Sequence, residues 1–553
     1  MDTFDYVIVG AGTAGCVVAS RLSEDPKVSV LVLEAGGSDR TVWIQLPIGY
    51  GRTFFDRRIN WMYDTAPVPG LSGRTSYWPR GKVIGGSGSI NAMVYVRGQP
   101  GDFDDWAAAG NPGWSFDEVL PWFRMSEDHD GGESAHHGSG GPIHVTDIGR
   151  RAHPLCQTFV EAAGALGFAA TPDFNGPDGE GVGIYQINTD KGRRASSANA
   201  FLRPASKRAN VALRARSHAT RVVFEGTRAV GVEYRRGNEI VRVMARREVI
   251  LCGGAVNSPQ LLQLSGIGDA ASLRALGISP VLDAPAVGQN LQDHLAVSYF
   301  YRSNRPTLND ELGPLSGRIK AGLRYLWDRG GPLSMSVNQG GGFVRSDASQ
   351  TRPNLQLYFS PVSYTGTPLS QRRLTQPDPF SAFLLSFNAC RPTSRGSLFI
   401  LSSDPFAHPV IQPNYLTTDK DIADAMAGIR LLRQLATTAP LSGIITGEIL
   451  PGEHLQSDES LLQDFQDRAD TVYHPVGTCM MGPDPARSVV DNRLRVHGVQ
   501  GLRVIDASIF PTITSGNTNA PTVMVAEKGA AMVAEDARAG LPVQVSASAF
   551  SHS

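Results

Sequence analysis

The stretch Gly10-Ala11-Gly12-Thr13-Ala14-Gly15 decides the fold at the start of this chain. An apolar run from Phe4 to Val9 precedes it, a helical pattern continues to about Ser23, and a second apolar run, Val28 to Leu33, ends at Glu34. This order indicates a βαβ unit. The glycines allow a tight turn that brings backbone amides close to a pyrophosphate, and Glu34 is placed to accept hydrogen bonds from an adenosine ribose. We therefore expect a Rossmann-like dinucleotide site.

Length and composition limit the remaining choices. A chain of 553 residues exceeds one comfortable hydrophobic core, so two packed domains are expected. Its 41% hydrophobic and 19% charged residues are typical of a globular enzyme, and its net charge of -1 gives no electrostatic footprint for nucleic acid. We expect no nucleic-acid partner.

The cysteines and the apolar segments bear on location. Five scattered cysteines, an odd number, match neither a disulfide framework nor a metal site, which favours reduced thiols and a cytoplasmic protein. The N-terminus does not resemble a signal peptide. No window approaches 18 uninterrupted apolar residues, so a spanning helix is not expected. Peripheral contact with the inner face of a membrane is left open, as is the oligomeric state.

A second glycine-rich stretch, Gly81 to Asn91, lies in a region from Gly36 to Gly149 that shows little clean periodicity. A flexible linker is the alternative interpretation, but the apolar Val83-Ile84 within it and the exit into Met93 to Val96 favour an ordered loop beside a cofactor.

Strand and helix patterns alternate along the later chain, which predicts an α/β fold, α+β overall. A small-residue turn, Cys252 to Ala255, separates one strand pattern from a helix, and Pro521 is expected to open another helix. The predicted strands cover 211–213, 219–224, 229–234, 248–251, 354–359, 383–388 and 502–505, and the predicted helices 258–264 and 422–437.

Two polar segments near the C-terminus point to chemistry: Tyr473-His474-Pro475-Val476-Gly477-Thr478 and Asn517-Thr518-Asn519-Ala520-Pro521. A helix that begins beside Asn517 would present its positive dipole end to an electron-rich ligand. The alternatives are ordinary turn roles: a histidine satisfied by backbone groups, and an asparagine that tolerates positive φ beside Gly516.

Over essentially its whole length, the chain resembles the glucose-methanol-choline (GMC) family of flavoprotein oxidoreductases. The resemblance rests on Gly81 to Asn91 with Arg97-Gly98, on Gly254 to Gly268, and on Val287-Gly288-Gln289-Asn290-Leu291-Gln292-Asp293-His294. Within the family, the chain is most similar to bacterial choline-dehydrogenase-like and FAD-dependent alcohol dehydrogenase members.

The resemblance implies a discontinuous FAD-binding domain over residues 1–155, 200–298 and 465–540. A substrate-binding domain, built on an antiparallel sheet with helices, would cover 156–199 and 299–464. The small and polar residues 541–553 are expected, from their composition, to form a flexible tail. Some members attach FAD covalently through a histidine at the position of Ile90, which cannot form such a bond, so FAD should be non-covalent.

By the same resemblance, FAD would be contacted by residues from both glycine-rich stretches and from the C-terminal segments. Gly10, Gly12, Gly15 and Glu34 would surround its ADP half, Asn91 would lie near the isoalloxazine, and Asp506 and Asn519 near the ribityl chain and ring. The remaining expected contacts are Thr13, Ala14, Ala35, Gly81, Val83, Gly86, Ser87, Ala92, Met93, Val94, Val222, Ala507 and Thr518.

The family's catalytic pair falls on His474 and Asn517. His474 would remove the hydroxyl proton of a primary alcohol while a hydride passes to flavin N5, and Asn517 would donate a hydrogen bond to the developing alkoxide. The product would be an aldehyde, and a quinone or another carrier would take up the electrons.

The substrate and the electron acceptor are less constrained. Without a convincing carboxylate for a choline cage, aliphatic or aromatic primary alcohols are the first expectation. The alternatives are choline dehydrogenase, an oxidase that reduces O₂ to H₂O₂, for which Val472 supplies compatible apolar surroundings, and a hydroxynitrile lyase on the same scaffold. The aromatic candidates for the cavity wall are Trp61, Met62, Tyr63, Phe343, Tyr358, Phe359 and Phe387, the alternative for each being ordinary core.

A nicotinamide-dependent reductase, a binding protein without catalysis and a metal site are further possibilities for this sequence. A nicotinamide-dependent reductase would leave the C-terminal His/Asn element unexplained, and a silent binding protein would not need it. The adjacent His136 and His137 look like surface residues without a supporting carboxylate or cysteine, so no metal site is predicted.

Overall fold

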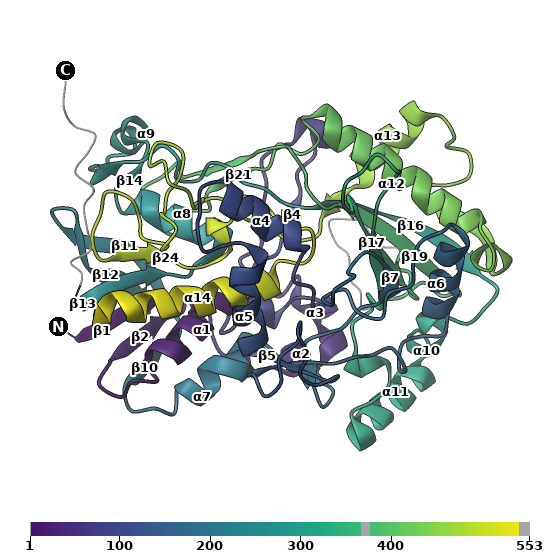
Figure 1. The fold of residues 1–553 in the computed structure, drawn as a ribbon, viewed down its shortest axis with the longest axis horizontal. Coiled ribbons are helices and arrows are strands. Elements are labelled where there is room, and N and C mark those ends of the chain that lie inside the picture. Colours follow the sequence, from purple (N-terminus) through teal and green to yellow (C-terminus); the bar gives the residue numbers. More distant parts are fainter. Residues whose placement is uncertain (1, 366–375, 541–553) are drawn as a thin grey trace.

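The computed structural model describes residues 2–365 and 376–540. Two large sheets lie toward opposite ends of the long axis (Figure 1). The expected tail, 541–553, lies outside the described residues. Among the helices of the described part, none is both long and apolar enough to cross a bilayer.

The first sheet has seven strands among the described residues, in the order β10-β2-β1-β13-β12-β11, with β24 paired to β13. Strands β10, β2, β1, β13 and β24 are parallel, whereas β11 and β12 are antiparallel. This arrangement confirms the predicted Rossmann-like unit. The strands are β1 (Thr3–Val9), β2 (Val30–Leu33), β10 (Val211–Arg214), β11 (Ser217–Glu225), β12 (Arg228–Arg236), β13 (Glu239–Leu251) and β24 (Leu502–Val504).

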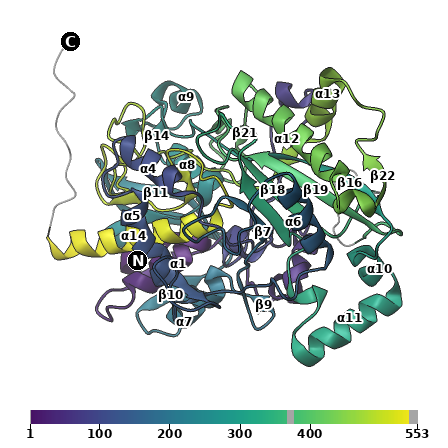
Figure 2. The ribbon, with the colours of Figure 1, turned by 45° about the vertical axis from the view of Figure 1, so that its right-hand side comes forward.

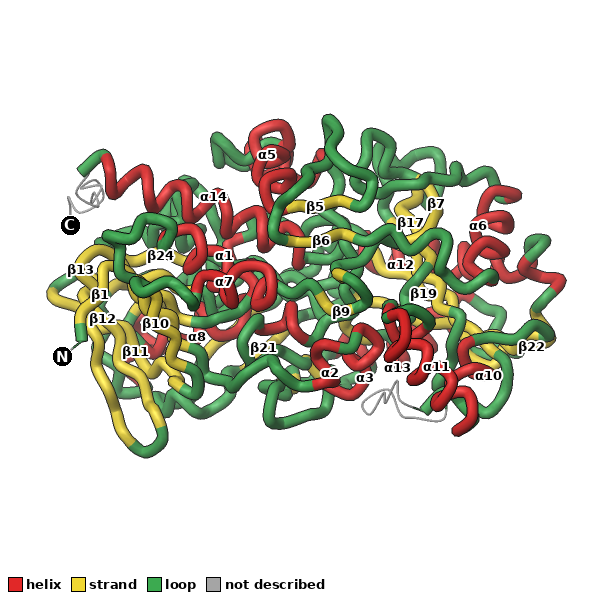
Figure 3. Tube along the Cα trace, turned by 90° about the horizontal axis from the view of Figure 1, so that it is seen from below, coloured by secondary structure: helices red, strands yellow, loops and turns green. Residues whose placement is uncertain are grey.

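Helices from both ends of the chain pack together against this sheet. Helix α1 (Thr13–Leu22) lies along α14 (Asn519–Arg538), and α5 (Phe116–Ser126) contacts α14 as well (Figures 1 and 3). A bidentate ion pair joins α1 to α14: Arg21 Nε and Nη2 donate to the two carboxylate oxygens of Glu527 at 2.6 and 2.8 Å. The first domain core is therefore complete only when residues some five hundred positions apart meet.

The second sheet is antiparallel, with the order β22-β16-β19-β18-β17-β7 and β23 paired to β16. Helices α6 (Leu155–Ala165) and α12 (Asp419–Thr437) contact it, and α13 (Asp458–Arg468) packs on α12 (Figure 2). The predicted antiparallel second sheet is thereby confirmed. Its strands are β7 (Gly181–Ile184), β16 (Leu295–Ser303), β17 (Gly340–Val344), β18 (Leu355–Ser360), β19 (Ala382–Ala389), β22 (Ile445–Leu450) and β23 (Asp470–Thr471).

The boundaries proposed for the two domains stay a prediction. Strand β16 begins at Leu295, before the proposed boundary at 298, and the buried Tyr63 and Trp78 pack into the core of the second sheet.

Successive side chains of the second sheet alternate between two environments. In β19, Phe383, Leu385 and Phe387 pack into the core under the helices, whereas Leu384 and Ser386 face a large pocket. This period of two follows from the pleat of a strand. It explains why Phe359 and Phe387 are core residues, while Tyr358 lines the pocket.

The region from Gly36 to Gly149 contains, besides short helical turns, two longer helices that its composition did not predict. These are α4 (Pro100–Ala108) and α5, and each begins with a capping box, Gln99 with Asp102 and Ser115 with Glu118. The second box, a serine followed three residues later by glutamate, is a recognised signal of a helix start and could have been read from the sequence.

The remaining elements are short or connect the larger ones. The helices are α2 (Val42–Gln45), α3 (Tyr50–Thr53), α7 (Arg203–Ala205), α8 (Gly254–Leu264), α9 (Ala270–Ala275), α10 (Leu308–Leu312) and α11 (Leu315–Asp328). The strand pairs are β3 (Tyr63–Asp64) with β4 (Tyr77–Trp78), β5 (Glu127–His129) with β6 (Ile143–Val145), β8 (Thr189–Asp190) with β9 (Arg193–Arg194), β14 (Ile267–Gly268) with β15 (Leu282–Asp283), and β20 (Ser397–Phe399) with β21 (Val410–Gln412).

Candidate active site

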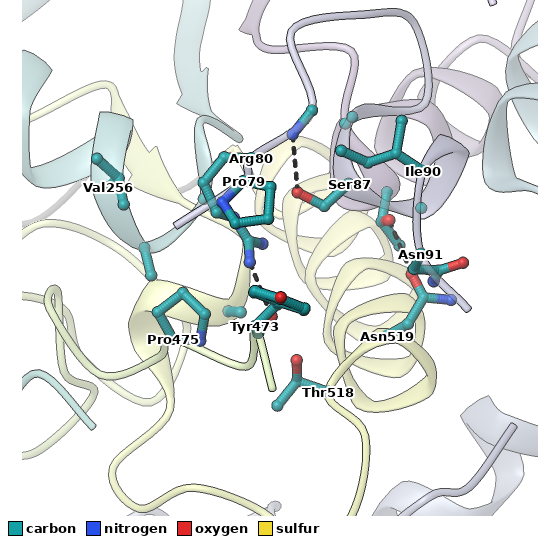
Figure 4. A pocket seen from close by; sticks show the side chains of 18 of the residues that line it. Pro79, Arg80, Ser87, Ile90, Asn91, Val256, Tyr473, Pro475, Thr518 and Asn519 are labelled. Atoms are coloured by element: carbon teal, nitrogen blue, oxygen red, sulfur yellow. Dashed lines mark hydrogen bonds between the residues drawn. The ribbon is translucent and has the colours of Figure 1, made fainter. Parts of the chain in front are cut away.

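A deep pocket runs from the first glycine turn to the inner face of the second sheet. It encloses about 2420 Å³ of non-atom space, its open mouth included. Figure 4 shows Ser87, from the second glycine-rich stretch, and Arg80, which directly precedes that stretch. They line the same pocket as Thr518 and Asn519 from the start of α14. Three segments that are far apart in sequence therefore form one cavity.

The nucleotide end of the pocket is built from glycines that no other residue could replace. Gly10 has φ +101°, and a Cβ there would lie 2.5 Å from the carbonyl oxygen of Cys252. A Cβ on Gly86 would lie 2.7 Å from Cα of Gly12, so the two glycine-rich loops touch. This contact brings the second loop beside the N-terminus of α1, where backbone amides are available to an anion.

Glu34 ends β2 inside this pocket. Its two carboxylate oxygens accept hydrogen bonds from the amides of Ala11 and Gly36 at 2.9 and 2.7 Å. Burial raises the pKa of Glu34 to about 7, against the opposing effect of these hydrogen bonds. The carboxyl group therefore braces the glycine turn and lies at the edge expected for an adenosine ribose.

Most of the residues expected to contact FAD line this one pocket. Gly15, Val83 and Val222 do not: a Cβ on Gly15 would lie 1.9 Å from the Gly10 carbonyl oxygen, Val83 packs in a small apolar core, and the Val222 amide donates to Ser265 Oγ. The expected residues that line the pocket are Gly10, Gly12, Thr13, Ala14, Glu34, Ala35, Gly81, Gly86, Ser87, Asn91, Ala92, Met93, Val94, Asp506, Ala507, Thr518 and Asn519, together with His474 and Asn517.

Arg194 holds the second glycine-rich loop in place, a role that sequence reasoning did not identify. Its guanidinium is buried and donates to the Gly88 carbonyl at 3.2 Å and to Asn91 Oδ1 at 2.6 Å. Asn91 Oδ1 also accepts from the Met93 amide at 3.1 Å, so two donors hold this pocket-lining side chain in place. Nothing in the sequence around Arg194 indicates this contact.

His474 lies between a second histidine and Asn517. His474 Nδ1 is 3.0 Å from His294 Nδ1, and His474 Nε2 is 3.0 Å from Asn517 Nδ2. His294 Nε2 is 2.9 Å from the carbonyl oxygen of Cys390, which can only accept, so His294 carries its proton on Nε2. The Nδ1 of His294 is then an acceptor for the Nδ1 proton of His474.

This chain of hydrogen bonds fixes the tautomer of His474, with Nε2 unprotonated. Asn517 Nδ2 donates to that nitrogen, and Gln356 Nε2 donates to Asn517 Oδ1 at 3.3 Å, which fixes the amide orientation. Asn517 does not adopt the left-handed backbone that its turn alternative would use. The proton-accepting nitrogen of the histidine and the amide donor that contacts it therefore lie together on the pocket wall.

Burial keeps both histidines neutral. The pKa of His474 is lowered well below the ordinary histidine value, first by burial and then by His294 and Arg80. Burial likewise lowers the pKa of His294 to about 4. A neutral imidazole at pH 7 is the form that can accept a proton.

The backbone around His474 is held by the residue that precedes His294. The His474 amide donates to Asp293 Oδ1 at 2.8 Å, and Thr471 Oγ1 donates to Asp293 Oδ2 at 2.5 Å. Tyr473 has φ +71°, an uncommon conformation that this network maintains. The pair Asp293-His294 belongs to a motif that carried the family resemblance, and that motif was the signal available for finding these two residues.

The expectation that His137 lies on the surface without a carboxylate is wrong. Its side chain is buried, with Nδ1 3.1 Å from Glu127 Oε2 and Nε2 2.6 Å from Asp173 Oδ2. The two carboxylates come from distant positions, which is why the local sequence did not show them. No cluster of three or more metal-ligating side chains occurs in the part of the chain that the structure describes.

The pocket fits FAD in shape and donor chemistry. One end of the pocket has the N-terminus of α1, the two glycine-rich loops, which contact each other, and Glu34. The other end has Asn91 and the His474–Asn517 pair. Between them, Asp506 accepts from Ser258 Oγ at 2.6 Å and from the Gly254 amide at 2.8 Å, which ties α8 to the end of β24. A dinucleotide laid along this cleft would meet backbone amide donors at the glycine loops and carboxylate acceptors at Glu34 and Asp506.

Comparison with known proteins gives two family models described as GMC oxidoreductase, one matching residues 4–296 and the other 392–526. The mitochondrial choline dehydrogenase of Homo sapiens is 44% identical over 544 residues, which cover 96% of this chain and 90% of that protein. The alcohol dehydrogenase (acceptor) of Pseudomonas putida is 42% identical over 537 residues, covering 96% and 95%. The solved structure of pyridoxine 4-oxidase from Mesorbium loti superposes with a TM-score of 0.86 at 32% identity, covering 96% of this chain and 99% of that one.

Proposed function

This chain belongs to the GMC oxidoreductase family, and on that premise we propose that it oxidises a primary alcohol to an aldehyde with non-covalently bound FAD. One observation carries the proposal: His474 Nε2, unprotonated because His294 fixes its tautomer, shares the pocket wall with the Asn517 amide. When bound, FAD supplies the acceptor for the hydride that leaves the alcohol carbon.

His474 and Asn517 divide the work on the hydroxyl group. With their nitrogens 3.0 Å apart, one hydroxyl oxygen can come within hydrogen-bond reach of both. A bound hydroxyl group would replace the direct contact between the two side chains: His474 Nε2 would accept its proton, and Asn517 Nδ2 would donate to the oxygen as negative charge develops on it. General-base catalysis of this kind contributes about 10²- to 10⁴-fold, and one donor to an oxyanion about 3 kcal/mol.

The site is expected to hold FAD without a covalent bond. Ile90, at the attachment position of some family members, is buried and carries no nucleophile. Acid precipitation should therefore release the flavin into the supernatant. A flavin that stayed with the precipitated protein would show that another side chain forms the bond.

The wall near His474 favours an aliphatic or aromatic alcohol. Met93, Val337, Leu384 and Val472 line the pocket together with several aromatic rings. Electron transfer to a quinone or another carrier agrees with the name of the Pseudomonas putida relative, alcohol dehydrogenase (acceptor). The five cysteines are buried and unpaired, which suits a reducing cytoplasm.

Choline is the second candidate substrate. The 44% identical human relative is named choline dehydrogenase, and Tyr50, Phe54, Tyr358, Tyr364 and Tyr473 line the pocket, which offers ring faces to a quaternary ammonium. Three carboxylates lie on the pocket wall, and each already has a partner: Glu34 accepts from backbone amides at the nucleotide end, Asp506 accepts from Ser258 and Gly254, and Asp470 accepts from Ser76.

Anaerobic mixing of the purified flavoprotein with benzylic, long-chain and short-chain alcohols and with choline tests the proposal. Bleaching of the visible flavin band by one class would support alcohol oxidation and identify the substrate class. Readmitting air then separates an H₂O₂-forming oxidase from a dehydrogenase. A flavin that stayed oxidised with every alcohol, combined with cleavage of a hydroxynitrile, would replace the proposal with the lyase.

A further inference from the structure

Helix α11, Leu315–Asp328, turns its large apolar side chains toward solvent. Eleven large hydrophobic residues are exposed in the described part of the chain, and five of them belong to this one helix. The exposed fractions are 73% for Leu315, 55% for Ile319, 62% for Leu323, 71% for Leu326 and 92% for Trp327. Such a concentration marks an interaction surface rather than the scattered exposure normal for soluble proteins.

These five side chains share one face of the helix. They recur at intervals of three or four residues, with Trp327 beside Leu323, and together form a stripe about a third of the circumference wide. The buried residues Ala321 and Tyr325 lie on the opposite face, and Tyr325 Oη donates to the Gly192 carbonyl at 2.9 Å. The helix is therefore fixed to the body by one side and offers the apolar side outward.

Basic residues flank the apolar stripe on both sides. By helical geometry, Arg318 falls on one flank, and Lys320 and Arg324 on the other, whereas Arg329 caps the end of the helix with its guanidinium over the Tyr325 ring. The segment 315–329 has a single acidic residue, Asp328, although the whole chain carries a net charge of -1. An apolar face bordered by Lys and Arg, with a tryptophan at its edge, is the pattern of a helix that lies in a membrane interface.

We propose that α11 docks on the surface of an anionic lipid bilayer. The apolar stripe would enter the boundary of headgroups and acyl chains, and the basic flanks would lie among the lipid phosphates. A second copy of this chain fits less well, because a two-fold contact through the stripe would bring basic flanks together. Figures 1 and 2 both show α11 at the outer edge of the molecule, accessible to a flat surface.

Docking would place part of the pocket wall near the lipid. The 3-10 turn Pro332–Ser334 follows α11 and contacts it, and the pocket-lining Val337 and Asn338 come directly after. If the proposed function holds, a lipid-soluble alcohol or quinone could reach the pocket from the bilayer. Binding to the bilayer does not itself depend on that reaction.

Vesicle flotation of the full-length flavoprotein tests the docking. We compare vesicles of equal parts phosphatidylglycerol and phosphatidylcholine with vesicles of phosphatidylcholine alone, at low and high salt. The wild type should float with the anionic vesicles, and Leu323→Glu/Trp327→Glu should reduce the bound fraction about ten-fold or more. High salt should weaken the wild-type binding, because it screens the basic flanks.

A matched control places the same change on another exposed surface. Ile240→Glu/Leu401→Glu alters side chains that are 58% and 68% exposed and lie outside α11, so this variant should float like the wild type. Equal binding by both double variants, or no binding by the wild type, would overturn the proposal.

Sedimentation velocity tests the alternative that a second copy of this chain, and not a bilayer, covers the apolar face of α11. A wild-type dimer that dissociates in the Leu323→Glu/Trp327→Glu variant, without vesicle binding, would make α11 an interface between copies and reject the bilayer. The flavin spectrum and the rate of flavin bleaching by an alcohol should be unchanged in both variants. Failure of the proposed alcohol chemistry would therefore be seen separately from failure of docking.

Discussion

His137 and His474 are both buried histidines, yet their surroundings leave one positively charged and the other neutral at pH 7. Burial lowers the pKa of His137, but the hydrogen bonds to Asp173 and Glu127 outweigh it and raise the pKa to about 9. Around His474, burial acts with His294 and Arg80, and all three lower the pKa. Two carboxylates thus make one histidine a permanent cation, and their absence leaves the other a neutral base.

The comparison teaches that the partners of a buried histidine indicate its role. His137 contacts Glu127 and Asp173, and Glu127 also binds the buried Arg97, whose Nη2 lies 2.7 Å from Glu127 Oε2, so His137 contributes to stability. His474 has a partner that fixes one nitrogen and a pocket beside the other. Four experiments test this distinction, from the largest expected effect to the smallest.

Replacing the neutral histidine should affect chemistry rather than folding. His474→Ala removes the proposed base, and the rate of flavin reduction by the preferred alcohol should fall by roughly 10²- to 10⁴-fold. Stopped-flow absorbance measures that rate, and the flavin spectrum checks that FAD is retained. A variant that kept the full rate would remove His474 from the role of base.

Replacing the charged histidine should affect folding rather than chemistry. His137→Leu leaves Glu127 and Asp173 without this partner, and the free energy of unfolding should fall by about 3–5 kcal/mol. Denaturant unfolding measures the loss, and the rate of flavin reduction in the folded fraction should be unchanged.

His144 offers a matched control, because it also contacts two carboxylates, Asp128 and Asp130, but is more exposed. The substitution His144→Leu should lower the free energy of unfolding by about 1 kcal/mol or less. Equal losses in His137→Leu and His144→Leu would contradict the importance of burial.

The partner of the base can be tested through its acceptor nitrogen. His294→Leu removes the acceptor for the Nδ1 proton of His474 and frees the ring to adopt the other tautomer, so flavin reduction should slow about ten- to a hundred-fold. His294→Gln supplies a carbonyl oxygen in that place and should recover much of the rate. A purely structural role for His294 would give equal rates in both variants once their folded fractions are matched.

The smallest effect concerns acid stability. A histidine whose folded pKa of about 4 is below its unfolded value loses stabilisation as pH falls below about 6.5, because the unfolded chain binds the proton first. Between pH 7 and 5.5, the free energy of unfolding of the wild type should fall by about 1 kcal/mol because of His294. The variant His294→Gln lacks this titrating group. Denaturant unfolding at the two pH values should therefore show that its free energy of unfolding falls by about 1 kcal/mol less than that of the wild type. Identical losses in the two proteins would show that His294 is not neutral in the folded state.

The sequence predicted those features that depend on short-range pattern. The Gly10–Gly15 turn between apolar strands, the second glycine-rich loop and the His474 and Asn517 segments each have local signals, and the structure brings them to one pocket. Their roles toward FAD and alcohol stay proposals. The antiparallel second sheet was also predicted, with strand ends within a residue or two of 355–360 and 382–389.

The missed features depend on contacts between distant residues. His294 reaches His474 across 180 positions, and His137 reaches Asp173 across 36, so neither partner was visible locally. The aromatic candidates were only partly right, because the pattern of a strand does not show which of its two faces meets the helices. Trp61 and Tyr358 line the pocket, whereas Phe359 and Phe387 belong to the core.

The packing of α1 against α14 also has a consequence during synthesis. Thr13 Oγ1 donates to Asn519 Oδ1 across 506 positions, and α14 supplies a wall of the cofactor pocket. A ribosome that has made the Gly10–Gly15 turn must still add some five hundred residues before that wall exists, roughly half a minute or more at about 5–20 residues per second. The cofactor pocket is therefore complete only when almost the whole chain has been made, and cofactor loading becomes one of the last steps of its maturation.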